Sequence, residues 1–273
     1  MVFDGHNDLL TSDKSYLQMA RYLIAECGKT DAHAVLALWT TELKENPYNI
    51  LDVADKHLRK HGFDKRFPLA VEDLSGFTKY GYEGLKKYNL LYASLTWNRE
   101  NALAGGANSD IGLKPAGRVA AAALRKTGAY LDTAHLCRAS FFEALTLDNK
   151  LLCSHTACDA LRKHPRNLTD EQIDGLIARG GKIGVVFVRE FLTDASAATS
   201  ADVARHIDRI VQKHGAGAVF ISTDYFGSDQ LASDLKSYRD MPVLVEKLRK
   251  MGYNDKAVGD VLFNNLRDLC AGR

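Results

Sequence analysis

The sequence of 273 residues lacks several features that mark whole classes of protein. No apolar run approaches the roughly 20 residues that span a bilayer, so we expect no membrane partner. The N-terminus does not carry a basic region followed by an apolar stretch, so we expect no signal peptide. Without a leader, the expected location is cytoplasmic.

Cysteine is also scarce. The five cysteines are odd in number and none has Cys-x-x-Cys spacing: Cys27, Cys137, Cys153, Cys158 and Cys270. This pattern favours reduced, buried thiols over the disulfide framework of a small secreted protein.

Neither sign of charge is in excess. The chain has 36 basic and 34 acidic residues and a net charge of +2, which gives no electrostatic basis for binding nucleic acid or an anionic membrane. There is no internal repeat, low-complexity tract or Pro/Gly/Ser-rich linker. We therefore expect one globular domain that covers residues 1–273.

Short apolar runs alternate with longer stretches of helical period. The expected strands are residues 2–10, 32–40, 67–74, 89–97, 129–135, 151–156, 182–188 and 218–225. The expected helices are residues 13–28, 49–61, 76–87, 115–127, 138–148, 169–179, 200–214, 237–250 and 256–269. Strand followed by helix, repeated in this way, predicts an α/β fold of the closed (β/α)8 TIM-barrel type. An open doubly wound sheet is the alternative, but no Gly-x-Gly-x-x-Gly follows the first strand.

The stretch FDGHNDLL at residues 3–10 places polar side chains inside an apolar run. Asp4, His6 and Asp8 occupy alternate positions, and side chains on a strand alternate between its faces. The three therefore point the same way, either to water on an edge strand or toward a site that uses them.

Other acids and histidines fall at the carboxyl ends of the expected strands, where barrels of this kind carry their active sites. A lone histidine at a strand end is more often a hydrogen-bonded loop residue than a ligand, so the prediction depends on convergence. Five candidate ligands share this end of the barrel: His6, Asp8, Glu72, His135 and His155. Burying them without a cation would be costly, and the ligand types suit zinc. Five exceed the three protein ligands usual at one catalytic zinc, which favours two Zn²⁺ ions that share a carboxylate and an activated water or hydroxide.

With these residues in place, the chain resembles the membrane (renal) dipeptidase family of zinc peptidases, which are amidohydrolase-like metal-dependent barrels. The resemblance covers nearly the whole chain, and the matching segments occur in order. They are DGHND (4–8), AVLALWT (34–40), VEDL (71–74), YASLTWNRENALAGG (92–106), YLDTAHL (130–136), SHTACDAL (154–161), HPRNLTDEQ (164–172) and HIDRIVQKHGAGAVFISTDYFG (206–227).

The resemblance implies a role for each matched residue. His6 and Asp8 would bind the first zinc, Glu72 would bridge both ions, and the two later histidines, His135 and His155, would bind the second. It also implies that Arg166 clamps the C-terminal carboxylate of a dipeptide, and that Asp224 shuttles a proton to the leaving amine. A homodimer and tolerance of a D-residue at the C-terminal position are further implications.

Two departures concern the substrate pocket. Trp97 stands where many members of the family have a histidine, and its indole can only donate a hydrogen bond or form an aromatic wall. Phe226 replaces an acid after the strand-eight aromatic residue. These departures favour the first alternative function, hydrolysis of another amide or of a lactone at the same dinuclear site. The second alternative is a non-catalytic barrel that is stabilised by its metal.

Simpler interpretations apply to several other residues. Cys153 and Cys158 flank His155 but are expected to be small packing residues rather than thiolate ligands. Five histidines on or beside expected helices are predicted to be solvated or to cap helix ends: His57, His61, His164, His206 and His214.

Overall fold

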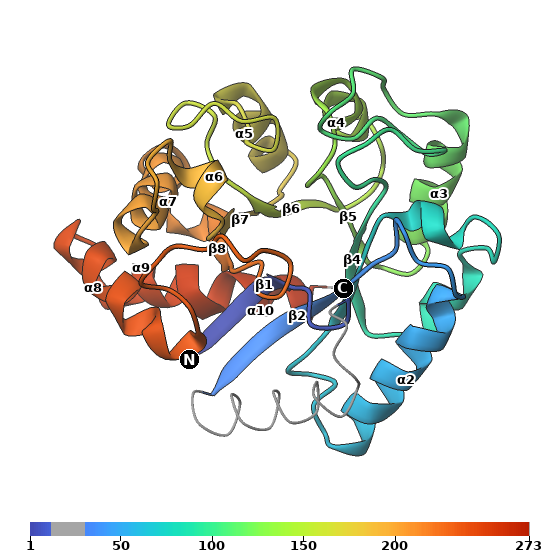
Figure 1. The fold of residues 1–273 in the computed structure, drawn as a ribbon, viewed down its shortest axis with the longest axis horizontal. Coiled ribbons are helices and arrows are strands. Elements are labelled where there is room, and N and C mark those ends of the chain that lie inside the picture. Colours follow the sequence, from blue (N-terminus) through green and yellow to red (C-terminus); the bar gives the residue numbers. More distant parts are fainter. Residues whose placement is uncertain (12–30, 273) are drawn as a thin grey trace.

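The structure is a computed structural model that describes residues 1–11 and 31–272. The expected helix at 13–28 and Cys27 lie outside the described residues. Eight parallel strands form one sheet in sequence order, and the helices surround it (Figure 1). The strands are β1 (Val2–Asn7), β2 (Ala32–Trp39), β3 (Leu69–Glu72), β4 (Leu90–Ser94), β5 (Tyr130–Asp132), β6 (Leu151–Thr156), β7 (Ile183–Val186) and β8 (Val219–Ser222).

The first and last strands close the sheet into a barrel. The amide of Asp224 donates a hydrogen bond to the carbonyl of His6 at 3.1 Å, and the amide of Asp8 donates to the carbonyl of Tyr225 at 2.9 Å. The predicted TIM barrel is therefore confirmed, and its closing contacts lie directly beside the expected metal ligands.

The helices follow the strands as expected at most positions. The described α-helices are α2 (Pro47–Lys60), α3 (Pro115–Arg125), α4 (Arg138–Ala144), α5 (Asp170–Ala178), α6 (Arg189–Leu192), α7 (Ser200–His214), α8 (Met241–Lys250), α9 (Asp255–Gly259) and α10 (Asn265–Ala271). Helix α5 begins with a capping box, because Thr169 and Gln172 each accept the other's backbone N–H. Helix α6 was not predicted, and a π-helical turn at Asp260–Asn264 joins α9 to α10.

The expected helix at 76–87 was wrong. That part of the chain forms two short 3₁₀ turns, Leu74–Phe77 and Glu83–Lys87. Glycine costs about 1 kcal/mol relative to alanine inside a helix, and this segment contains Gly76, Gly81 and Gly84. Gly81 also takes a φ of 74°, which a right-handed helix cannot contain.

Two apolar clusters support the barrel. The larger lies between the strands and the outer helices, and the smaller joins strand residues such as Phe3 and Phe220 to Leu266 and Leu269 of α10. Gly5 is required at this level, because a Cβ there would overlap the Phe220 ring. Within the described parts of the chain, no helix is long and apolar enough to cross a bilayer.

Candidate metal centre and substrate pocket

The eight residues predicted for the site all lie at the carboxyl end of the barrel. Most line one cavity of about 360 Å³, which contains Asp8, Glu72, Trp97, His135, His155, Arg166 and Asp224 in its wall. His6 is fully buried beneath this wall and contacts its carboxylates. Strand ends place these residues: His6 lies in β1, Glu72 ends β3 and His155 lies in β6.

Carboxylates surround His6 on its Nε2 side. The Nε2 atom lies 3.2 Å from Asp8 Oδ2, 3.2 Å from Glu72 Oε2 and 3.9 Å from Asp224 Oδ1. The ligand atoms of His6, Asp8 and Asp224 all lie within 4.8 Å of one another, as do those of His6, Glu72 and His155. Each group offers the nitrogen and oxygen donors that a divalent zinc ion prefers.

Glu72 connects this cluster to the other two histidines. While its Oε2 faces His6, its Oε1 lies 2.9 Å from Nε2 of His135. The Nε2 atoms of His135 and His155 are 2.9 Å apart. A carboxylate whose two oxygens face different sets of donors has the arrangement that a bridging ligand needs.

The Nδ1 atoms of His6, His135 and His155 each have a hydrogen-bond partner that fixes the tautomer of the ring: Tyr92, Asn98 and Ser154, respectively. Tyr92 Oη donates to the carbonyl of Gly5 at 2.8 Å, so it is free to accept from His6 Nδ1, also at 2.8 Å. Ser154 Oγ donates to Asp132 at 2.5 Å and can accept from Nδ1 of His155 at 2.7 Å. These contacts leave the Nε2 lone pairs directed at the centre of the site, as in metal-binding histidines.

The charge distribution also fits a cation. Burial, together with the positive charges near it, holds the pKa of His155 well below its ordinary 6.5, and burial and Arg166 lower the pKa of His135 to about 4. Burial opposes protonation of His6, but its interactions with Tyr92, Asp8 and Glu72 outweigh burial and raise its pKa well above 6.5. The Nε2 atoms of His135 and His155 are 2.9 Å apart, and Glu72 Oε1 lies 2.9 Å from the first of them, an arrangement that favours a divalent ion between these groups.

Asp224 follows β8 in an unusual backbone conformation, with a φ of 58°. Its amide hydrogen bond to the carbonyl of His6 holds it beside the end of β1, where it lines the cavity. Burial and the neighbouring charge of Asp8 raise the pKa of its carboxyl group well above 3.8. Gly227 makes room here, because a Cβ at that position would overlap both Asp8 Oδ2 and Asp224 Oδ1.

Asp4 has a supporting position below the metal ligands. Its carboxylate accepts hydrogen bonds from the Thr223 amide at 2.8 Å, from the Thr223 hydroxyl at 2.6 Å and from the Tyr238 hydroxyl at 2.7 Å. It also accepts from the amide of His6 at 3.2 Å. Asp4 therefore fastens β1 to the chain after β8 and does not face the cavity.

Arg166 is a buried cation without a carboxylate partner among the described residues. Its Nη2 donates to the carbonyl of His155 at 3.3 Å, its Nη1 lies 3.5 Å from Asn98 Oδ1, and its buried Nε has no partner. Its Cζ also lies 5.3 Å from the centre of the Phe191 ring. A guanidinium group has five N–H donors, so most of its hydrogen-bonding capacity is unused.

Aromatic rings form another part of the wall. Trp97 packs edge-on against Trp39 with 5.2 Å between ring centres, and both line the cavity with Phe191 and Phe226. Phe226 adopts a φ of 70°, which turns the chain after β8 around the cavity. The departures noted in the sequence, Trp97 and Phe226, thus contribute to an aromatic part of the cavity wall.

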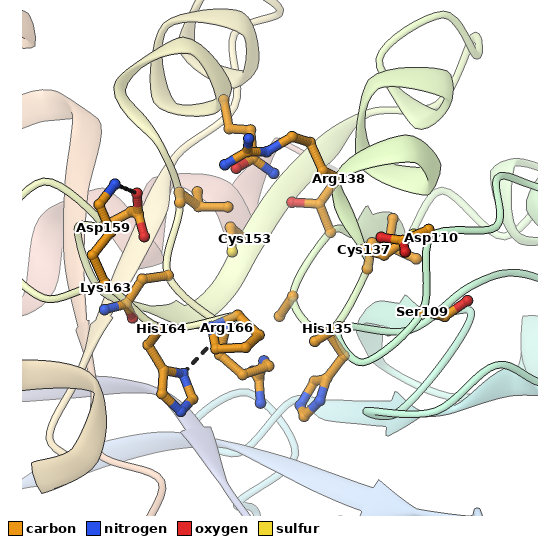
Figure 2. A pocket seen from close by; sticks show the side chains of 18 residues that line it. Ser109, Asp110, His135, Cys137, Arg138, Cys153, Asp159, Lys163, His164 and Arg166 are labelled. Carbon is orange, nitrogen blue, oxygen red and sulfur yellow. Dashed lines mark hydrogen bonds and ion pairs between the residues drawn. The ribbon is translucent and has the colours of Figure 1, made fainter.

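A second cavity of about 370 Å³ lies beside the first and shares His135 and Arg166 with it. Figure 2 shows these two residues near one end of this cavity, with Cys153 in its interior and Lys163 paired with Asp159 at its side. Cys153 does not line the metal pocket, which agrees with its expected packing role.

Several residues of the site were missed in the sequence. Tyr92 and Ser154 are the first residues of the matched segments at 92–106 and 154–161, but neither was assigned a role beside His6 or His155. The prediction that His206 is solvated or capping was wrong, since it is 1% exposed. Its Nδ1 accepts from the amide of Cys158 at 2.9 Å and its Nε2 lies 3.0 Å from the carbonyl of Leu192, so it joins two loops.

Comparison with known proteins identifies the family of the chain. The family model for membrane dipeptidases, peptidase family M19, matches residues 71–268. Dipeptidase verJ of Clonostachys rogersoniana is 28% identical over 187 residues, which cover 67% of this chain and 48% of that protein. An uncharacterised protein from the pqqA 5' region of Klebsiella pneumoniae is 28% identical over 183 residues, 62% of this chain and 67% of its own length. The chain thus spans about half of the first relative.

Solved structures share the whole barrel. An amidohydrolase from Pseudomonas aeruginosa superposes with a TM-score of 0.86 at 19% identity, over 100% of this chain and 96% of the other. A metallopeptidase from Rhodobacter sphaeroides, solved with a phosphinate mimic of the dipeptide L-Ala-D-Ala, gives 0.80 at 18% identity, over 99% and 98%. At these identities the likeness shows the fold alone. With a family model that matches most of its length, the chain belongs to the membrane dipeptidase family, peptidase family M19.

Proposed function

We propose that the protein is a metallo-dipeptidase that uses two zinc ions. His6, Asp8, Glu72, His135 and His155 would hold the ions, with Glu72 between them. When bound, the ions supply Lewis acidity, which polarises the scissile carbonyl and lowers the pKa of a water molecule.

The proposal of a dipeptide substrate depends on the position of Arg166. A buried guanidinium with unused N–H donors, in the same 360 Å³ cavity as the metal ligands, is suited to a carboxylate. A free C-terminal carboxylate so close to the hydrolytic centre suits a dipeptide rather than a long chain. The limited cavity volume supports the same choice.

Residues of the chain would orient the substrate, exclude water and transfer a proton. Arg166 would orient the substrate by its carboxylate, and the aromatic wall of Trp97 and Trp39 would exclude water from one side. Asp224, with its raised pKa, would accept a proton from the attacking water and deliver it to the leaving amine. Tolerance of a D-residue at the C-terminal position is part of the proposal, supported by the L-Ala-D-Ala mimic bound to the Rhodobacter metallopeptidase.

Two measurements test the proposal. Metal analysis of the purified, zinc-loaded protein should give about two zinc ions per chain, whereas one or none would contradict the dinuclear site. A panel of L,L- and L,D-dipeptides should be hydrolysed in preference to lactones and to dipeptides with a blocked C-terminus. Preference for lactones would instead support the alternative hydrolase, which the aromatic walls of Trp97 and Phe226 favour.

A protein that binds zinc and hydrolyses neither class would support the non-catalytic alternative. The expected homodimer and cytoplasmic location stay predictions, to be checked by solution mass measurement and by fractionation of cells.

A further inference from the structure

We infer that Asn98 is a shared positioning residue that links the metal ligand His135 to the clamp Arg166 and presents its amide N–H₂ group to the substrate carboxylate. This inference deepens the proposed function and rests on it for the identity of the substrate. Asn98 follows the end of β4, is half-buried, and lines the 360 Å³ cavity.

One atom of Asn98 makes both contacts. Its Oδ1 lies 2.8 Å from Nδ1 of His135 and 3.5 Å from Nη1 of Arg166. The first distance is that of a good hydrogen bond, and the second is at the long limit. A carbonyl oxygen has two lone pairs, so it can accept from both groups at once. Asn98 therefore holds Nδ1 of His135, just as Tyr92 holds Nδ1 of His6 and Ser154 holds Nδ1 of His155.

The orientation of the amide follows from its neighbours. A guanidinium group can only donate, so the atom of Asn98 that faces Arg166 must be the oxygen. The Nδ2 group then points away from both contacts. Within the described residues Asn98 Nδ2 has no hydrogen-bond partner. The atom is not among the buried polar atoms that lack a partner, and Asn98 lines the cavity, so Nδ2 is accessible from it.

The loop around Asn98 is held firmly, which fixes the position of the amide. The carbonyl of Asn98 accepts from the amide of Asn108 at 2.8 Å. Asn101 then ties the loop to its base, since its Nδ2 donates to Asp73 Oδ1 and to the carbonyl of Leu95, both at 2.8 Å. Because the donor is already oriented, little side-chain entropy is lost when it binds an oxygen of the ligand.

Asn98 and Arg166 line the same cavity, and this identifies the group that Nδ2 would bind. A carboxylate held by Arg166 has a second oxygen, which can accept from the neutral Nδ2 donor of Asn98. Asn98 would thus complete the recognition of a free C-terminus while it holds the metal-binding ring in its tautomer.

Two substitutions separate these roles. Asn98→Asp keeps an acceptor toward His135 and Arg166 but replaces the N–H₂ donor by an anionic oxygen. We expect unchanged zinc affinity, while KM for a dipeptide rises about tenfold or more and kcat changes less. Asn98→Ala removes both contacts, and zinc affinity should weaken by about 10–100-fold. Asn108→Ala, an exposed position in the same loop, is the matched control and should change neither quantity.

The zinc affinity is measured with a competing chelator and the kinetics with an L,D-dipeptide, after thermal melts show that each variant is folded. An Asn98→Ala protein with wild-type zinc affinity would overturn the link to His135, and an Asn98→Asp protein with wild-type KM would overturn the contact with substrate. If the wild-type protein hydrolyses no dipeptide, the proposed function fails, while the zinc titration still decides the role of Asn98 toward His135.

Discussion

The hydroxyl oxygen of Tyr92 lies 2.8 Å from Nδ1 of His6, and the same hydroxyl donates to the carbonyl of Gly5 at 2.8 Å. One phenol group therefore connects the backbone of β1 to the side chain of His6, a candidate metal ligand on the same strand. Because the hydroxyl hydrogen is used on Gly5, the ring of His6 must donate from Nδ1, so Nε2 is the atom that would lose its proton to bind the proposed cation.

Replacement of Tyr92 by Phe tests whether its hydroxyl fixes the tautomer of His6. The change leaves the buried Nδ1–H of His6 without an acceptor, which costs about 1–3 kcal/mol of stability. The proton of the neutral ring can then lie on either nitrogen. Zinc affinity should weaken by about 10–100-fold, as measured by competition with a chelator. Tyr80→Phe, on an exposed side chain, is the control. Equal affinities in the two variants would show that the phenol has no part in metal binding.

Zinc binding should depend on pH through His6. The pKa of this residue is raised well above 6.5 in the metal-free protein by its interactions with Tyr92, Asp8 and Glu72, so zinc must displace a proton from His6 at any pH below that pKa. Affinity is then fully present above the raised pKa and declines as the pH falls through it, by about tenfold per pH unit for one displaced proton. Zinc titrations over neutral and mildly acidic pH measure this slope. A constant affinity throughout would contradict the assignment of His6 as a ligand that must lose a proton.

Asp224→Asn should separate proton transfer from metal binding. The amide keeps the shape of the side chain but cannot carry a proton between water and amine. We expect kcat to fall by about 10²–10⁴-fold, with zinc content close to two per chain. Kinetics and metal analysis on the same preparation provide the comparison. Loss of zinc together with activity would instead make Asp224 a metal ligand.

Arg166→Lys should act on substrate binding. Lysine keeps the positive charge but loses the planar fork that fits a carboxylate, so KM for a dipeptide should rise by about 10–100-fold with a smaller change in kcat. Arg138→Lys, at the neighbouring cavity in Figure 2, gives the control. An unchanged KM in the Arg166 variant would remove the reason for preferring dipeptides.

Gly227→Ala should disable the site while the barrel stays folded. The added Cβ would overlap the carboxylates of Asp8 and Asp224, so one of them must move out of position. Gly217→Ala is a close control, since a Cβ there meets no atom within 4 Å. We expect lower zinc affinity and activity for the first variant and wild-type values for the second, with similar melting temperatures for both. Full activity of Gly227→Ala would show that the carboxylates tolerate displacement.

Much of this architecture could be predicted because its signals are local. Strand ends were within a few residues of those observed, since an apolar run bounded by turn residues has one clear interpretation. The meeting of the candidate ligands could be predicted for the same reason: they lie at the strand ends where barrels hold their sites.

The partners of those ligands were not predictable in this way. Tyr92 lies 86 positions from His6 in the chain, and only the register of the closed barrel brings them together. Asn98 could equally have been a turn residue, and nothing in its own loop shows that His135 and Arg166 share its oxygen. His206 follows a helical pattern that also suits an exposed face, yet the loops after β6 and β7 fold over it.

The closing contact between β1 and β8 has a consequence for how the protein matures. His6 and Asp8 are synthesised before Asp224, and Asp4 is synthesised before Thr223 and Tyr238, which donate hydrogen bonds to it. The centre cannot be assembled until the last strand has met the first, so a ribosome-bound chain that ends before β8 has no complete place for the ion. The proposed ions would therefore bind only after β1 and β8 have paired, and they would then hold the first and last strands together.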